Sequence, residues 1–404
     1  MERFYHSAVE TKALEKKQEK SKKNQESEID YQPSFINYNS MKIIDLYVIK
    51  KYLGTLIFML ALLSIIIMVV DVQAKTPRIE SNGFTVGYFL INFYPFWILN
   101  LILTFMSILV FITVIFFTSR MANNTEIVAV ISSGASFHRF ARPYLITSLL
   151  IFTATLAVNH FILPWANIKK NILEPYTYNS VNKEKLLGNM SIASNISPTD
   201  YIFVNSYNKK ENRGSGYMYQ KFDKNKKLVY QITAMDINWD SKKKHFIINN
   251  YIERTAGKND TETLGQGTSK IQDFKLPPSE LFPDKLVAQN KTTPELLTMI
   301  EREKMKGNNN VTSFYNELYQ RTSMPVSIII LTFLGLSLSS QKKRGGLGLN
   351  LAVGIALAFL FVFSFQVLNV VSENKSLPPL LAMWLPNMIF APIAAYLYIK
   401  RANQ

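Results

Sequence analysis

Side chains that could carry chemistry are few in this sequence, and they are not grouped as a catalytic or metal site requires. The chain has no cysteine, which excludes disulfides, thiolate metal sites and cysteine nucleophiles. No two of its histidines have the i, i+4 spacing of paired metal ligands; the four are His6, His138, His160 and His245. A G-x-S-x-G elbow and a convincing pair of carboxylates are also absent from the sequence. We therefore expect no catalytic residue, no metal site and no cofactor bound by this chain.

A nucleotide-binding loop is missing from the sequence as well. The form G-x-x-x-x-G-K-[ST] places backbone N–H groups and a lysine around phosphates. The nearest glycine clusters, residues 265–270 and 345–348, have a different spacing and no strand-to-helix context. Any ATP that powers this protein is therefore expected to be hydrolysed by another chain.

Six long apolar blocks must position whatever function the chain has. They are about 18 to 25 residues long, enough to cross a hydrocarbon layer of ~30 Å as helices. We predict membrane spans at residues 53–70, within 88–118, and at 143–163, 323–340, 347–370 and 378–399. Almost no ionisable side chain lies within them, whereas a proton- or sodium-coupled carrier normally has such groups in mid-membrane. The spans therefore favour an energy source outside this chain over an independent secondary transporter.

The basic residues of the short loops predict the orientation of these spans. If the N-terminus is inside, the inside segments carry eleven, namely Lys42, Lys50, Lys51, Arg120, Arg139, Arg142, Lys342, Lys343, Arg344, Lys400 and Arg401. The short outside loops then carry three, namely Lys75, Arg78 and Lys375. We therefore expect both termini to be cytoplasmic and the long segment 164–322 to lie on the far side of the membrane.

The polar segments complete the expected organisation. Residues 1–40 have balanced charge and are predicted to be a solvated helix or a disordered tail, unless translation starts at Met41. Alternating residues at 201–204, 216–220, 228–232 and 245–248 predict the short strands of a sandwich or jelly roll. We thus expect an α-helical integral membrane protein with six transmembrane helices and an inserted all-β jellyroll-like domain. Its parts are residues 1–40, helices at 41–163, β-domain at 164–291, helical connector at 292–322 and helices at 323–404.

The loop between the second and third spans contains a short predicted helix near residues 124–134. Asn123, Asn124 or Thr125 would cap it, and Glu126 in its first turn complements the helix dipole. Gly134 would end it. Such a helix suits a groove on a partner protein, or it rests on lipid. The acidic Glu126 favours the partner, because a helix adapted to an anionic leaflet is more often basic.

Four short stretches, together with the order of three spans, outer β-domain and three spans, resemble one family. The stretches are IDLYVIKKYL at 44–53, EIVAVISSG at 126–134, QRTSMP at 320–325, and LPPL with WLPN at 377–380 and 384–387. Over residues 41–400 the chain resembles the LptF/LptG family of lipopolysaccharide export permeases. Asp71 resembles the LptG type more than the LptF type, although Met68 stands where LptG-type members have a basic residue.

The resemblance implies a half-transporter that extracts lipopolysaccharide from the outer leaflet of the inner membrane of a Gram-negative bacterium and passes it to a periplasmic bridge. The implied partners are a dimer of an LptB-like cytoplasmic ABC ATPase, an LptF-like sibling permease, an LptC/LptA-like jellyroll bridge protein and the membrane lipids. By the same resemblance, the short loop helix is the coupling helix that docks on the ATPase, with Glu126, Ile127, Val130 and Gly134 as its coupling residues.

The resemblance also implies residues for the lipid path. Lys75, Arg78 and Arg321 are candidates for the outer rim that meets lipid phosphates, although each also fits a structural role or an ordinary loop cation. Asp71, Phe361 and Phe365 are candidates on the two gate helices, the phenyl rings being alternatively packed or lipid-facing. Pro325 is expected to shape the first turn of the fourth span rather than to touch substrate.

The net charge of +16 does not indicate nucleic acid as a ligand, because the topology accounts for the inner excess of basic residues. A positive outer segment is compatible with an anionic glycolipid. The remaining alternative is a membrane-anchored periplasmic sensor or envelope assembly factor. Six spans are more than an anchor needs, so the permease is the favoured interpretation.

Overall fold

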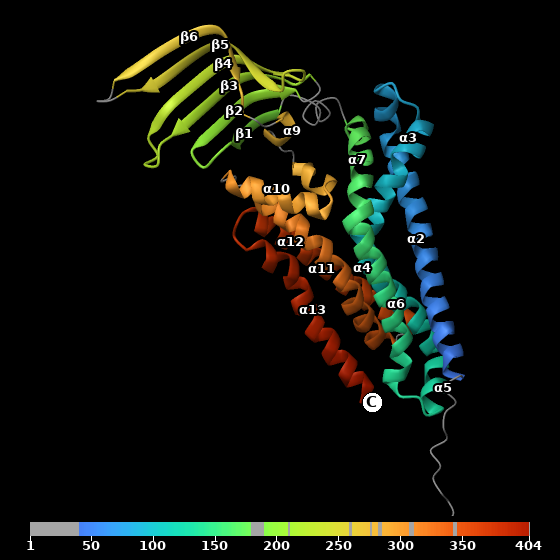
Figure 1. Cartoon of the computed structure of the whole chain (residues 1–404). Helices are drawn as coiled ribbons and strands as arrows, with labels where there is room; N and C mark the ends of the chain where they lie inside the picture. The colour runs from blue at the N-terminus through green and yellow to red at the C-terminus, as the bar shows by residue number, and fades with distance from the viewer. Residues whose placement is uncertain are drawn as a thin grey trace, which may run out of the picture. The chain divides into compact units, whose positions relative to one another are not determined.

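The computed structural model describes residues 40–178, 190–208, 211–257, 261–274, 277–281, 285–306, 311–341 and 346–403. Apart from Ser40, the predicted N-terminal tail lies outside the described residues, as do Lys342, Lys343 and Arg344. Figure 1 shows two sets of long helices, separated along the chain by a β-sheet.

Six helices in the described residues are long and apolar enough to cross a membrane, which confirms the predicted number of spans. In the first half these are α2 (Ser40–Ser81), α4 (Tyr94–Asn123) and α6 (Phe137–Ala157), which continues through a π-helical turn at Val158–Ile162 into α7 (Leu163–Leu173). In the second half they are α11 (Val311–Ser339), α12 (Gly346–Glu373) and α13 (Pro379–Ala402). The short helices include α3 (Val86–Asn92), α5 (Glu126–Ser132), α9 (Pro278–Leu281) and α10 (Thr293–Met305), with the 3-10 turns η2 (Glu174–Thr177) and η4 (Lys285–Asn290).

Three spans begin several residues earlier than the apolar blocks indicated. The first was expected from residue 53, whereas α2 begins at Ser40. Pro143 lies inside α6 rather than at its start. The fourth span was expected from residue 323, whereas α11 begins at Val311. Its extra turns carry Phe314, which is buried with Leu296 and Ile300 of α10. These turns are therefore stabilised by packing on the connector rather than by hydrocarbon, which is why hydropathy did not reveal them.

In its described residues, the inserted domain forms a single antiparallel sheet of six strands in chain order, which confirms an inserted all-β domain. Its strands are β1 (Met190–Asn195), β2 (Asp200–Asn208), β3 (Arg213–Phe222), β4 (Leu228–Asp240), β5 (His245–Ala256) and β6 (Glu262–Gln272). The meander is simpler than a two-sheet jelly roll, and the sequence analysis had anticipated β2 to β5 but not the two edge strands. One face buries the alternating apolar side chains Ile202, Val204, Ile232 and Ile248.

The glycines of the 265–270 cluster lie in β6 and not in a phosphate-binding loop. A Cβ at Gly267 would come within 2.7 Å of the Tyr251 side chain on the neighbouring strand. Gly265 lies opposite Glu253, which pairs with Lys270. The hydrogen bond from Lys270 lowers the pKa of the Glu253 carboxyl, because it stabilises the charged form. These glycines therefore make room for side chains that lie across the strand.

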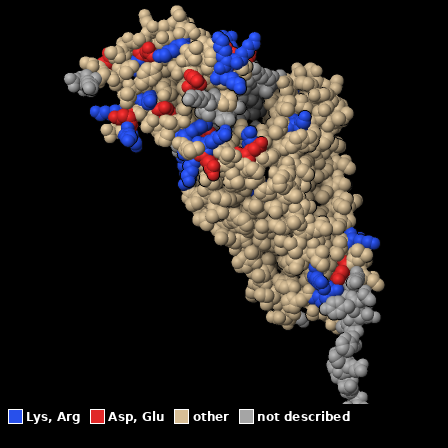
Figure 2. Space-filling view, in the orientation of Figure 1, with Lys and Arg blue, Asp and Glu red and all other residues tan. Residues whose placement is uncertain are grey.

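The helices alternate in direction, so their ends gather at two opposite ends of the helical region. At one, which we call the α5 end, a core cluster joins Tyr52 of α2, Phe117 of α4, Tyr144 of α6 and Leu336 of α11. At the other, the Lys75 end, Ile79 of α2 packs with Phe93 and Tyr94 beside the start of α4. In the view of Figure 2, charged side chains are nearly absent between these ends. That distribution is the one expected of a membrane-spanning region.

Candidate functional site

The loop helix expected near residues 124–134 is present as α5, but it begins without the predicted cap. The residue before it, Thr125, has φ of 60° and makes no side-chain capping bond. Glu126 begins the helix, and Gly134, with φ of 90°, follows its end as predicted. Asn124 contributes differently from the expectation, because its Nδ2 donates to Glu126 Oε1 at 3.2 Å rather than accepting from the backbone.

Glu126 forms an ion pair that the local sequence did not reveal. Lys51 of α2 places its Nζ 3.1 Å from Oε2 and 3.3 Å from Oε1 of Glu126. The two side chains are 30% and 27% exposed, so both remain accessible to solvent. The residues are 75 positions apart, and the only sequence signal was the presence of two lysines at the start of the first span.

The predicted coupling residues of α5 differ in accessibility. Ile127 is buried in the core at the α5 end, together with Tyr52 and Met121. Val130 is partly buried against the same core. The open face instead presents Val128, which is 58% exposed and which the sequence analysis did not select. An exposed apolar residue beside an acidic one is a suitable contact for another protein.

At the Lys75 end, the predicted rim lysine is part of a cluster. Lys75 Nζ lies 3.0 Å from Asp71 Oδ2, one helical turn earlier on α2. Tyr94 Oη donates to the same carboxylate oxygen at 3.0 Å. The ammonium also lies over the rings of Trp97 and Phe93, with centroid distances of 5.2 and 5.8 Å. Asp71 and Lys75 thus form one half-buried unit, and an anion that bound Lys75 would compete with Asp71.

The other two rim candidates occupy contrasting positions. Arg78 is exposed near the end of α2. Arg321 is only 3% exposed, and each of its guanidinium nitrogens has a partner. Nε donates to Glu317 Oε1 at 3.0 Å, Nη1 to Thr293 Oγ1 at 3.2 Å and Nη2 to the Ala288 carbonyl at 3.0 Å. This geometry supports the structural role for Arg321 that the sequence analysis left open.

Pro325 lies in the interior of α11 and not in its first turn as expected. Because proline has no N–H, it cannot donate to the carbonyl of Arg321 four residues earlier. Asn159 of the π-helical turn supplies a donor instead, with Nδ2 3.4 Å from that oxygen. Nearby, Ser107 of α4 donates to the Met324 carbonyl at 3.0 Å and Asn387 of α13 to the Ser323 carbonyl at 2.7 Å. Side chains from three neighbouring segments therefore hold the proline region of α11.

The two phenylalanines assigned to the fifth span are packed inside the protein. Phe361 and Phe365 of α12 are 2% and 3% exposed, and Phe361 meets Phe390 of α13 with ring centroids 5.1 Å apart. The exposed face of α12 instead carries Phe359 and Phe363, stacked at 5.9 Å. Of the alternatives left open, the geometry supports packing for Phe361 and Phe365.

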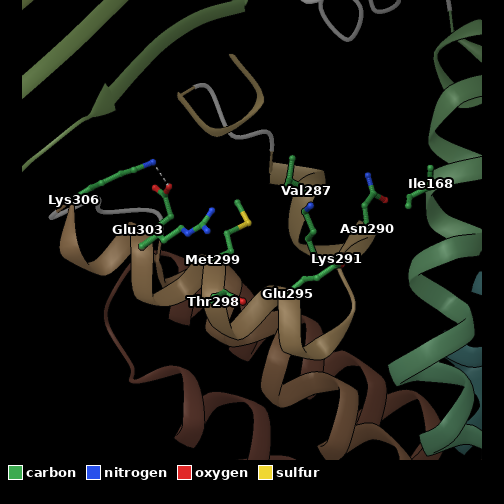
Figure 3. A pocket seen from close by; sticks show the side chains of 10 residues that line it. Ile168, Val287, Asn290, Lys291, Glu295, Thr298, Met299, Glu303 and Lys306 are labelled. Atoms are coloured by element: carbon green, nitrogen blue, oxygen red, sulfur yellow. Dashed lines mark hydrogen bonds and ion pairs between the residues drawn. The ribbon is translucent and has the colours of Figure 1, made fainter. Parts of the chain in front are cut away.

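A pocket of about 480 Å³ lies over the connector, between α10, η4 and Ile168 of α7 (Figure 3). Its lining mixes charged and apolar side chains, and an ion pair of 2.8 Å between Lys306 and Glu303 crosses one side. Glu295 accepts from the Thr292 backbone N–H at 2.9 Å. That hydrogen bond lowers the pKa of Glu295 and secures the start of α10. The charges of the pocket are thus partly used in holding the connector together.

Within the described part of the chain, no group of three or more His, Asp or Glu side chains could hold a metal ion. The expectation that the chain binds no cofactor stays a prediction.

The comparison with protein families gives a match over nearly the whole chain. The family model for the lipopolysaccharide export system permease LptF/LptG matches residues 46–400, nearly the whole chain, and it does not distinguish LptF from LptG. No curated relative matches the chain. The chain therefore belongs to the LptF/LptG family, and it is a multi-pass inner-membrane protein that serves as a transport subunit, the permease of a lipopolysaccharide export transporter.

Proposed function

We propose that this chain is one half of the membrane part of an ABC transporter, which extracts lipopolysaccharide from the outer leaflet and uses ATP hydrolysed by a separate cytoplasmic ATPase. A sibling permease would supply the other half. The observation that carries the proposal is α5, a short helix with an accessible carboxylate at Glu126 and an exposed Val128 beside it. That surface is suited to a partner protein with a basic and an apolar contact.

The distribution of charge supports a cytoplasmic position for α5. The α5 end gathers the start of α2, the end of α4 and the start of α6, where the short-loop basic residues are concentrated. The last turn of α13 is there too, since His138 Nδ1 and Tyr398 Oη are 2.9 Å apart. In this orientation both termini are cytoplasmic and the β-sheet domain is periplasmic.

The packing of α2 supports a lateral path for lipid. Between Leu56 and Ile79 no residue of α2 is fully buried, and large apolar side chains such as Ile65, Ile66 and Val69 are exposed. The exposed face of α12 is similarly apolar. Such faces suit acyl chains or a partner helix, and the Lys75 cluster would place a cation near the phosphates at the outer rim.

The sheet supports transfer to a bridge protein of related fold. Among the described strands, β1 and β6 each pair with one neighbour only, so each leaves one edge unpaired. An unpaired edge offers N–H and C=O groups that can template a strand of another chain. We propose that lipopolysaccharide leaves the membrane along this domain towards a periplasmic LptC/LptA-like protein.

The test is to tag the C-terminus, extract the chain gently from its native membrane and identify what purifies with it. A Walker-type ATPase and a second six-span protein are expected. Glu126→Ala should leave the chain folded in the membrane but reduce recovery of the ATPase. Glu373→Ala is the control, because Glu373 is an exposed glutamate at the far end of α12. Normal ATPase recovery and normal export with Glu126→Ala would remove the assignment of α5. Recovery of the unmodified chain alone, or with signalling proteins, would favour the sensor.

A further inference from the structure

The Lys51–Glu126 ion pair joins two elements that the proposed function treats separately, the gate helix α2 and the helix α5. Both carboxylate oxygens of Glu126 lie within 3.3 Å of Lys51 Nζ. Asn124 Nδ2 donates to the same carboxylate at 3.2 Å. Glu126 is therefore oriented by two donors, one from α2 and one from its own loop.

The pair lies over a well-packed core. Val48, Tyr52 and Leu56 of α2 share a buried cluster with Ile127 of α5. Tyr52 is fully buried, and its Oη lies 2.9 Å from Thr332 Oγ1 of α11. The start of α2 and α5 are thus packed into one unit, and Lys51 adds a polar contact at its accessible edge.

Beyond this unit, the middle of α2 has only partly buried contacts, made by Leu60, Met68 and Val72. Leu56 is 4% exposed, and the next buried side chain on the helix is Ile79. A tilt of the middle of α2 would therefore not expose a fully buried side chain of that helix between Leu56 and Ile79. The middle of α2 therefore lies between two packed ends, the α5 unit and the Lys75 end.

We propose that Lys51 is a positioning residue that links α5 to the gate helix α2. A basic group of the ATPase competes with Lys51 for the carboxylate of Glu126. When Lys51 is displaced, the position of α2 changes. The inference rests on the proposed function, since it takes Glu126 to be the ATPase contact. It adds that the same carboxylate has an internal partner, which nothing in the family match assigns.

The physical chemistry of the pair suits an exchange. Ion pairs that are partly exposed to water contribute little stability, so replacing one cation by another has a small cost. A lysine ammonium on a flexible stem is also easily displaced, in contrast to a bidentate arginine. A buried pair would be too costly to open in every transport cycle.

The test compares Lys51→Met with Lys50→Met in the complete complex, reconstituted in proteoliposomes. Lys50 is the matched control, because it is an exposed neighbour on α2 that forms no ion pair with the described residues. Three quantities are measured: recovery of the ATPase, ATP hydrolysis, and lipopolysaccharide released per ATP. Since the chain has no cysteine, spin labels at Ala61→Cys on α2 and Leu150→Cys on α6 can report movement of α2 in each nucleotide state.

Lys51→Met should retain the ATPase and its hydrolysis, while lipopolysaccharide released per ATP falls about fivefold or more, the lower range of allosteric coupling. The nucleotide-dependent change in the label distance should shrink in the same variant. In Lys51→Glu with Glu126→Lys, the internal pair is restored with reversed charge, so the resting label distance should return while ATPase recovery stays low.

Two results would overturn the inference without touching the proposed function. One is equal release per ATP in Lys51→Met and Lys50→Met. The other is an unchanged nucleotide response of the α2 label in Lys51→Met. Failure of the proposed function would look different, because the ATPase would then be missing from the unmodified complex, or would bind normally to Glu126→Ala.

Discussion

Helices α2 and α11 are both candidate membrane spans, but 6% of the most apolar stretch of α2 is buried, against 56% of that of α11. Along α11, Ile328, Leu331 and Leu334 are fully buried. Along α2, large apolar side chains remain exposed from Ile57 to Val70. Two helices that both qualify as membrane spans by hydropathy therefore lie in two different environments, one inside the protein and one at its surface.

The charged residues of the two helices differ in the same way. Arg321 of α11 is buried and bonded through all its guanidinium nitrogens. Lys51 and Lys75 of α2 belong to partly exposed pairs near its two ends. We conclude that α11 anchors the second half of the chain, whereas α2 is packed near its ends and largely exposed between them. Three predictions test this difference.

The largest expected effect comes from the ion pair on α11 between the buried Arg321 and the partly buried Glu317. Arg321→Met would leave Glu317 without its cation and would remove one of two donors to the Ala288 carbonyl, the other being the Lys291 N–H. Breaking a buried ion pair by removing one partner costs about 3–5 kcal/mol, because an uncompensated charge remains. We expect a large fall in the thermal unfolding midpoint of the purified chain in detergent.

The double variant Arg321→Met with Glu317→Leu separates the loss of stability caused by an unpaired charge from the loss caused by altered packing. With both charges replaced by apolar groups, much of the lost stability should return, since such replacements are often close to neutral. If Arg321→Met alone unfolds at the same temperature as the unmodified chain, the guanidinium does not stabilise α11. The charged residues of α11 and α2 would then not differ in their contribution to stability.

The second expected effect comes from the difference in side-chain burial between α11 and α2. Leu331→Ala in α11 removes a fully buried side chain and should cost about 2–5 kcal/mol. Leu62→Ala in α2 removes a side chain that is 43% exposed and should cost less than about 0.5 kcal/mol. Thermal unfolding in detergent measures both. Equal losses would show that α2 is buried in the native chain, for example by a partner that survives purification.

The sequence predicted the number of spans, the inserted β-domain and a short helix near residues 124–134, because each depends on local periodicity or on a helix-ending residue such as Gly134. It could not distinguish the environments of α2 and α11, since hydropathy does not tell lipid from protein. The early start of α11 was missed for the same reason, as Phe314 is buried by α10.

The candidate site was predictable only in part. The helix carrying Glu126 was found, but its partner Lys51 lies on another helix, and no local pattern links them. Phe361 and Phe359 lie two positions apart in one apolar run, yet Phe361 is 2% exposed and Phe359 is 70% exposed. Which side of α12 faces inwards depends on contacts with α13, and one sequence does not contain that information.

The smallest expected effect concerns the Lys75 cluster, where α2 would meet the lipid. Lys75 is shared between Asp71 and the Trp97 ring, so only part of its charge is available to an anion. Asp71→Asn removes the competing carboxylate and should raise capture of lipopolysaccharide by a photocrosslinker at Val72 by a few-fold, while Lys75→Met should lower it. A charge-assisted contact of about 1 kcal/mol corresponds to a change of that size. The matched control is Lys375→Met, an exposed lysine between α12 and α13. If Lys75→Met and Lys375→Met capture lipopolysaccharide equally, Lys75 serves only to hold its end of α2 through Asp71, and that end of the helix is then structural.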